Sequence, residues 1–282
     1  MSVRRAIDRV ITWKATPYLI LVLIGSALLL PIYWTVVTSF KPLNEVFRWP
    51  PTLWPSEFTL VHYVEALVNA PIFWNILNST IYSLIVTVFV ITIGTLTTYG
   101  FSMFPYRGSG KVAFAFLAIR VIPPQILWLP FIIIYTRLGL INTRPGVAIF
   151  EIMLVYPLSI WLIKGIFDSF PKELIDSAAI DGASRILTLI RIVVPVVAPA
   201  IGAVAIISFL WTWNEFMFPF LVLNNEKLHP ITVGLHYFVG DEGIKWGPIS
   251  ASGVLAMLPG LIFFIFAQRY IIEGLTEGAV KQ

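Results

Sequence analysis

The chain has 282 residues, of which 58% are hydrophobic and 12% are charged, and its mean hydropathy is +0.86. Soluble domains contain about 25% charged residues, so this composition indicates an integral membrane protein. The sequence has no cysteine, which excludes disulfides and thiolate chemistry. The formal net charge of +4 does not indicate a nucleic-acid partner, because the basic residues flank apolar segments instead of clustering. His62, His229 and His236 are too far apart in sequence for a local metal motif, so we expect no metal site.

Six apolar segments are long enough to cross a bilayer, which takes about 20 residues in a helix. The first is too long for the apolar part of a signal peptide and ends without a cleavage site, so we expect an uncleaved span. The sequence therefore predicts an all-α polytopic membrane protein with six transmembrane helices, in a single domain over residues 1–282. The expected spans are 17–40, 76–101, 112–135, 146–166, 196–223 and 251–270.

The distribution of Lys and Arg predicts the orientation of these spans. With the N-terminus in the cytoplasm, the inner segments carry twelve Lys and Arg residues and the outer segments six, and the intramembrane Arg120 completes the total of 19. Positive residues concentrate on the cytoplasmic side of membrane proteins, so both termini are predicted to be cytoplasmic. The outer segments 48–67 and 229–247 contain several aromatic and proline residues, which predicts folded loops with interfacial anchors.

Three polar residues fall inside predicted spans, where a polar group without a partner or a role is costly. Arg120 lies near the middle of the third span, and Asn214 and Glu215 lie near the outer end of the fifth. We expect all three in a pathway through the membrane. The alternatives are that Arg120 pairs with a polar group on a neighbouring helix, and that the other two simply lie at the interface.

Prolines are expected to interrupt two of the spans. Pro123, Pro124 and Pro130 fall in the third span, and Pro219 falls in the fifth. Broken helices are tolerated within a membrane where they line a cavity, so these two spans are predicted to line a pore.

Residues 176–200, DSAAIDGASRILTLIRIVVPVVAPA, form a charged connection between the fourth and fifth spans on the predicted cytoplasmic side. The pattern predicts a helix that starts at Pro171, a sharp turn at Gly182, and a second helix with Ser184 as its N-cap. Pro195 is then expected to open the fifth span. An ordinary amphipathic loop on the lipid headgroups is the alternative.

This connection resembles the EAA motif of ATP-binding-cassette importer permeases, in which E-A-A-x-x-D-G-A is followed by I-x-x-P. Asp176 stands in place of the usual Glu, and Ser177 replaces the first Ala. Residues 121–143 and 209–223 are similar to segments of the carbohydrate permeases, and the tail 268–282 is similar to that of the maltose-type inner-membrane subunit. The motif residues are Asp176, Ala178, Asp181, Gly182, Ala183, Ile192 and Pro195.

The resemblance implies that residues 168–195 hold a coupling helix that docks on a cytoplasmic ATPase, and that the chain forms half of an alternating-access pathway for a sugar, of di- or oligosaccharide size. It further implies a hetero-oligomer in the cell membrane with a second homologous permease, two ATPase subunits and an extracytoplasmic solute-binding protein. The tail 271–282, with Gly274, Thr276 and Gly278, would contact the ATPase subunits. The partner ATPase subunits would bind ATP and Mg, and this chain would need no cofactor of its own.

Other functions fit the sequence less well. GSGK at 108–111 lacks the flanking residues of a phosphate-binding loop, so the chain is not expected to hydrolyse ATP or to be an enzyme. An ion-driven carrier would need a titratable relay, and a membrane enzyme would need clustered His or carboxylates. Within the resemblance, glycerol phosphate or another polyol could replace the sugar. NST at 78–80 is a formal glycosylation sequon without an expected role.

Overall fold

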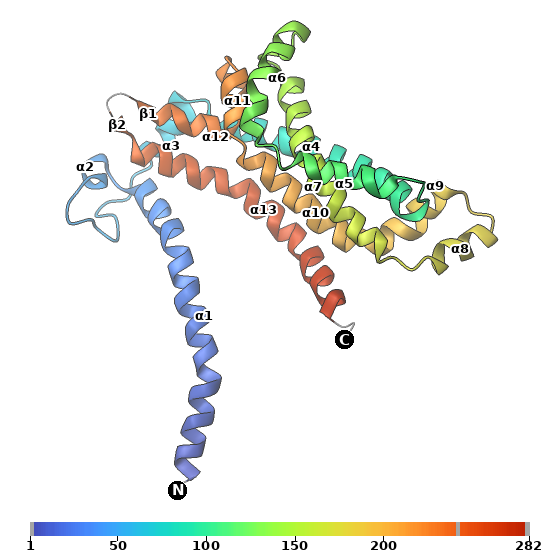
Figure 1. The fold of residues 1–282 in the computed structure, drawn as a ribbon. Helices are drawn as coiled ribbons and strands as arrows, with labels where there is room; N and C mark the ends of the chain where they lie inside the picture. Colours follow the sequence, from blue (N-terminus) through green and yellow to red (C-terminus); the bar gives the residue numbers. More distant parts are fainter. Residues whose placement is uncertain (1–2, 241–242, 280–282) are drawn as a thin grey trace. The chain divides into compact units, whose positions relative to one another are not determined.

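The computed structural model describes residues 3–240 and 243–279, and helices form most of its elements (Figure 1). The chain divides into two compact units. Unit 1 consists of residues 1–70 and 237–255, and unit 2 of residues 71–236 and 256–282. The organisation as one domain over residues 1–282 stays a prediction.

Unit 1 contains one long apolar helix, several short elements and a small hairpin. The two strands are antiparallel, and Val239 pairs with Ile244. The elements of unit 1 are α1 (Val3–Phe40), α2 (Leu43–Val46), α3 (Val61–Val64), the π-helical turn η1 (Glu65–Asn69), β1 (Val239–Gly240), β2 (Gly243–Ile244) and the first part of α13 (Trp246–Ala279).

The loop after α1 is folded around a buried polar network. Lys41 is only 1% exposed and donates from Nζ to the Thr52 carbonyl at 2.6 Å. Glu45 is also buried, and it accepts hydrogen bonds from the Thr52 hydroxyl and from both the amide and the hydroxyl of Ser56. These bonds lower the pKa of Glu45 below its usual value, and the bond from Thr52 is the largest cause. The segment 41–56 is therefore folded, and its later part belongs to segment 48–67, for which a folded loop was predicted.

Unit 2 carries four long helices, two short helix pairs and the connections between them. Gly94 lets α4 approach α7 closely, because an added Cβ would lie 3.2 Å from Ile163 Cδ1. The elements of unit 2 are α4 (Ile72–Met103), α5 (Ser109–Ile119), α6 (Pro124–Leu138), α7 (Arg144–Asp168), α8 (Glu173–Ile180), α9 (Arg185–Thr188), the π-helical turn η2 (Leu189–Val193), α10 (Val194–Asn214), α11 (Met217–Val222), η3 (Glu226–Leu228), α12 (Ile231–Gly234), the first half of η4 (Leu235–Phe238) and the later part of α13.

Five helices among the described residues are long and apolar enough to span a membrane, and a bent pair of helices makes a possible sixth span. This pair is α5 and α6, which meet at 92°, so the third span expected over 112–135 is interrupted, as Pro123 and Pro124 predicted. Pro123 has an extended conformation, because the residue before a proline is pushed out of the helical region. Pro130, by contrast, lies inside α6 and does not break it.

The bent pair connects the two ends of unit 2. α5 starts next to the loop that contacts α9, where Phe104 lies under the Arg185 side chain. α6 ends at the turn whose Asn142 amide donates to the Val222 carbonyl of α11. In Figure 1, α8 and α9 lie at one end of unit 2 and α6 and α11 at the other. The pair is therefore a broken span that crosses from one end to the other.

The fifth span also differs from its prediction of 196–223. It is a continuous helical stretch over 185–214, and it ends at Asn214. Pro195 therefore lies within this stretch instead of opening it. The break falls at Glu215 and Phe216, and Pro219 lies in the first turn of α11, where its missing amide costs no hydrogen bond.

Side chains at the start of α4 bind the connection between α11 and α12. Asn75 Nδ2 donates to the carbonyls of Glu226 and His229, and Tyr82 Oη donates to the Leu228 carbonyl. Asn78 is fully buried, donates to two carbonyls of the same connection, and accepts a hydrogen bond from an Arg side chain at the start of α7. The side-chain amide of Asn78, the first residue of the NST sequon, therefore has a structural role.

Candidate functional site

A cavity of about 600 Å³ lies in unit 2, and the breaks in both interrupted spans line it. The α5–α6 break contributes Arg120 and Pro124, and the α10–α11 break contributes Asn214 and Glu215. The structure therefore brings the three polar residues singled out from the sequence into one cavity. The rest of the lining is largely aromatic and apolar and includes Gln125, Trp128, Phe131, Phe150, Met153, Leu154, Pro157, Trp211, Phe216 and Met217.

Two contacts hold the Arg120 side chain in the cavity. Its Nη1 donates to the Leu154 carbonyl of α7 at 2.8 Å, and its guanidinium carbon lies 4.7 Å from the centre of the Trp211 ring. Pro157 has no amide to donate to the Met153 carbonyl one turn back, so regular helical pairing is interrupted beside Leu154. Among the described residues, Arg120 is in no ion pair. A guanidinium has five N–H donors, so others stay available to a bound molecule.

Asn214 and Glu215 have structural contacts as well. Asn214 Nδ2 donates to the Leu210 carbonyl at 2.7 Å, and Glu215 Oε1 accepts from the Phe218 amide at 3.2 Å. The Glu215 carbonyl also accepts from the Thr232 hydroxyl at 2.6 Å. Glu215 thus caps the first turn of α11 and fixes the break. Only its Oε1 takes part in this cap. A role for these residues in a pathway stays a prediction.

Glu151 is a buried acidic residue that was not predicted from the sequence. It lies in α7, is 2% exposed, and its Oε1 has no hydrogen-bond partner among the described residues. It is also an acidic residue within the predicted fourth span, and the cost of burying such a group in a membrane is the signal that could have found it.

The connection between α8 and α9 forms a tight corner, which we call the α8–α9 corner (residues 173–188). The Gly182 amide donates to the Ala179 carbonyl, and the Ala183 amide donates to the Ala178 carbonyl. With Gly182 at φ +78°, these two bonds make a Schellman motif, which ends a helix with a glycine in the left-handed region. Ser184 caps α9 by accepting from the Leu187 amide, as predicted. The helix was predicted to start at Pro171, but α8 begins two residues later, at Glu173.

The motif residues of this segment fall into two groups. Asp176, Asp181 and Gly182 are exposed, and so is Pro195. Ala178 is buried, Ile192 packs against the core beneath the corner, and Ala183 is half-buried. Some of these residues therefore build the corner, while others face outward where a partner can reach them. Docking of a partner there stays a prediction.

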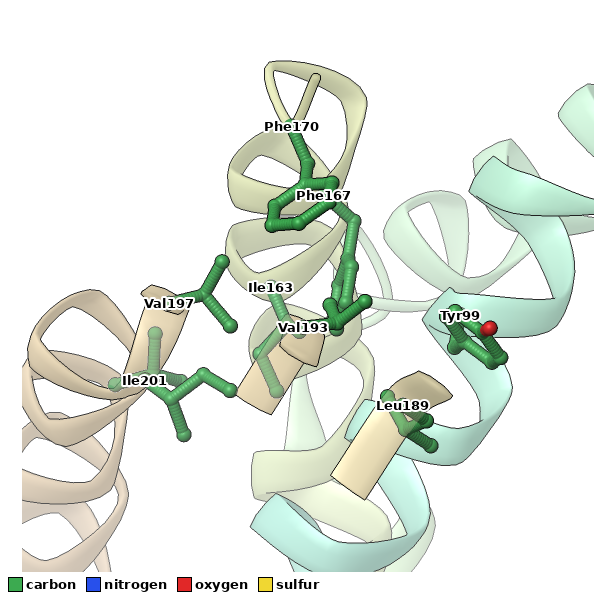
Figure 2. Close-up of a cluster of buried hydrophobic side chains, with 9 residues drawn as sticks. Tyr99, Ile163, Phe167, Phe170, Leu189, Val193, Val197 and Ile201 are labelled. Atoms are coloured by element: carbon green, nitrogen blue, oxygen red, sulfur yellow. The ribbon is translucent and has the colours of Figure 1, made fainter. Parts of the chain in front are cut away.

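A cluster of buried apolar side chains supports the corner. It joins four segments: the end of α4 with Tyr99, the end of α7 with Phe167, the turn η2 with Leu189 and Val193, and the first turns of α10. Figure 2 shows these side chains converging from their separate helices. Leu189 and Val193 are 2% and 0% exposed, so the chain that leaves the corner is anchored to α4 and α7.

The backbone of Gly274, Thr276 and Gly278 is helical, because α13 runs to Ala279. The side chains of these residues lie outside the described part of the structure, as do residues 280–282. The predicted contact of this tail with ATPase subunits stays a prediction.

Broken spans around a cavity that holds Arg120, Asn214 and Glu215, together with an exposed helical corner at the other end of unit 2, are features of a membrane transport protein. The protein family that the chain matches is also a family of transport proteins. Residues 107–277 match the family described as binding-protein-dependent transport system inner membrane component. The chain belongs to this family.

Individual relatives match nearly the full length. The chain is 33% identical over 271 residues to the trehalose/maltose transport system permease protein MalG of Thermococcus litoralis, covering 93% of this chain and 96% of that one. It is 30% identical over 254 residues to the arabinooligosaccharides transport system permease protein AraQ of Halalkalibacterium halodurans, covering 89% and 90%. A crystal structure of a bacterial ABC transporter involved in the import of alginate, an acidic polysaccharide, has a similar chain (TM-score 0.78, 19% identity, 96% and 98% covered), which supports the fold.

Proposed function

We propose that this chain is one of two membrane-spanning subunits of an ATP-driven importer, and that it forms half of an alternating-access pathway for a di- or oligosaccharide. The observation that carries the proposal is the cavity itself. Helix breaks from two spans meet there and present Arg120, Asn214 and Glu215 beside the aromatic rings of Trp128 and Trp211. Hydroxyl-rich molecules are recognised by such planar hydrogen-bonding groups, and aromatic faces pack against their apolar C–H surfaces.

The partners proposed for the complex follow from family membership. A second homologous permease would complete the pathway, two ATPase subunits would bind ATP and Mg, and an extracytoplasmic binding protein would deliver the sugar. The exposed α8–α9 corner supports the ATPase contact, because Asp181 and Gly182 are accessible on its surface. We further propose that the chain itself carries no enzymatic activity.

The test is uptake by the complete complex in proteoliposomes, with trehalose, an arabino-oligosaccharide and glycerol 3-phosphate as labelled substrates. ATP-dependent uptake of an oligosaccharide that is insensitive to ionophores is the expected result. Uptake of glycerol phosphate alone would favour the polyol alternative. Uptake that needs an ion gradient, and that ionophores abolish, would show a secondary carrier instead.

A further inference from the structure

The end of α4 and the start of α9 are joined by three side chains. Tyr99 Oη donates to the Arg185 carbonyl at 3.1 Å, and the Arg185 guanidinium lies 4.2 Å from the centre of the Phe104 ring. The rings of Tyr99 and Phe104 meet edge to face, with their centres 5.4 Å apart. Each of these residues contacts the other two. We call this set of Tyr99, Phe104 and Arg185 the α4–α9 clamp.

The hydroxyl of Tyr99 is not needed to satisfy the carbonyl to which it donates. The Arg185 carbonyl already accepts the Leu189 amide within the helix, so the hydroxyl adds a second bond to it. Tyr99 is 5% exposed, and its ring packs against Phe167 of α7 at 6.2 Å. A phenylalanine would fill that space without a polar atom to satisfy. The hydroxyl therefore serves to join two helices that are far apart in sequence.

The direct route from the corner into the fifth span is structurally weaker. α9 leads into the π-helical turn Leu189–Val193, and Pro195 and Pro199 follow shortly after. A π-helical turn and the missing proline amides are the usual places where a helix bends. Leu189 and Val193 anchor this turn to the buried cluster, but the turn and the prolines make the direct route less stiff than a regular helix. The clamp supplies a second route, from Arg185 across to α4.

α4 packs closely against α7, and α7 lines the cavity. Gly94 allows the close approach of these two helices, and the same α7 supplies the Leu154 carbonyl that holds Arg120. A movement of α4 is thus transmitted to the wall of the cavity by direct contact. We infer that the α4–α9 clamp makes α4 move with the α8–α9 corner, so that movement imposed on the corner by the ATPase reaches the cavity. This inference rests on the proposed function.

The variants that test the clamp are Tyr99→Phe, which removes only the hydroxyl, and Phe104→Leu, which removes the aromatic face. The matched control is Tyr106→Phe, which removes the hydroxyl of an exposed tyrosine two residues after Phe104, in the same α4–α5 connection. ATP hydrolysis and sugar uptake are measured in the same proteoliposomes, after co-purification has shown that the ATPase is bound. We expect Tyr99→Phe to raise the ATP hydrolysed per sugar imported about fivefold, the effect of one hydrogen bond of ordinary strength, and the control to leave it unchanged.

A purely structural role would lower uptake and hydrolysis together and keep their ratio, and that result would overturn the inference. A normal ratio in both variants with the ATPase bound would also overturn it. Hydrogen exchange of the permease pair without ATPase provides an independent measurement. The amides of residues 187–193 should exchange about fivefold faster in Tyr99→Phe, and unchanged exchange would show that the clamp holds nothing. Failure of the wild-type complex to import sugar with ATP would instead contradict the proposed function.

Discussion

Arg120 holds a positive charge in a membrane cavity with one backbone carbonyl and one indole ring as its contacts. These contacts position the guanidinium but do not neutralise it. The sequence predicted this residue from its position within a span, and also predicted the alternative that it pairs with a polar group on a neighbouring helix. The hydrogen bond to the Leu154 carbonyl on α7 agrees with that alternative, while Arg120 also lines the cavity, and its role in a pathway stays a prediction.

We predict that Arg120→Ala lowers sugar uptake by about 10- to 100-fold while the complex still assembles, because a charged hydrogen bond contributes about 1.5–3 kcal/mol. Arg120→Lys should retain part of the uptake, since it keeps the charge but not the planar stacking on Trp211. Arg137→Ala is the control, because Arg137 is an exposed arginine of α6. Uptake is measured beside co-purification of all subunits. Loss of the assembled complex would show that Arg120 is structural.

Glu45 gives the loop after α1 a defined pH dependence. Its folded-state pKa is lowered, the hydrogen bond from Thr52 being the largest cause and those from Ser56 adding to it. The ionised carboxylate therefore stabilises the folded loop at pH values above the unfolded pKa of about 4.3. This contribution is lost as the pH falls through the lowered folded-state value.

We predict that hydrogen-exchange protection of residues 48–58 stays constant from pH 7 to pH 5, after correction for intrinsic exchange, and falls below about pH 4. Glu45→Gln should lower the protection at pH 7 and remove the decrease on acidification. Glu57→Gln, which changes an exposed neighbour, is the control. An equal decrease in Glu45→Gln would assign the effect to another group.

At the scale of elements, the spans were predictable from composition, but their breaks were only partly so. Pro123 followed by Pro124 breaks the third span, because the first proline is forced out of the helical region by the second. Pro130 and Pro219 have no such neighbour and lie inside helices. The break at Glu215 depends on bonds to Phe218 and Thr232, and Thr232 is distant enough in sequence that no local pattern shows it.

The α8–α9 corner was the most predictable element, because local residues determine it. Gly182 has φ +78°, and an added Cβ would meet no atom of this chain within 4 Å. A side chain there is therefore strained by the backbone conformation alone, by about 1–2 kcal/mol. Any crowding at this position would come from a docked partner.

We predict that Gly182→Val and Asp181→Lys sharply reduce binding of the ATPase and its stimulation by sugar-loaded binding protein, while the spans insert normally. Gly165→Ala is the matched control, since Gly165 lies inside α7 with open space around it and without a positive φ. Co-purification of the ATPase and stimulated ATP hydrolysis are the measurements. Full binding and full stimulation in both variants would show that the corner is only a loop on the membrane surface.

At the scale of the whole molecule, the sides of the membrane can be checked against the contacts within unit 2. Two connections predicted to be cytoplasmic meet where Arg185 lies over Phe104. Two connections predicted to be outside meet where Asn142 binds the amides of Asn224 and Asn225. The connections predicted to lie on the same side of the membrane therefore meet at the same end of unit 2, which agrees with the predicted topology. In this topology, α5 and α6 together cross the membrane once. Which end faces the cytoplasm depends on the Lys and Arg count alone.

The absence of native cysteine makes this orientation directly testable by labelling single cysteines with an impermeant reagent. Glu57→Cys and Lys227→Cys should react in intact cells, because both positions are exposed in segments predicted to be outside. Ser56 is a poorer choice, since its hydroxyl and amide bind Glu45. Arg107→Cys and Lys172→Cys should react only after permeabilisation, because both are exposed in segments predicted to be cytoplasmic. The reverse pattern at all four positions would invert the topology. It would also place the α8–α9 corner on the wrong side of the membrane for a cytoplasmic ATPase, and the proposed coupling would fail with it.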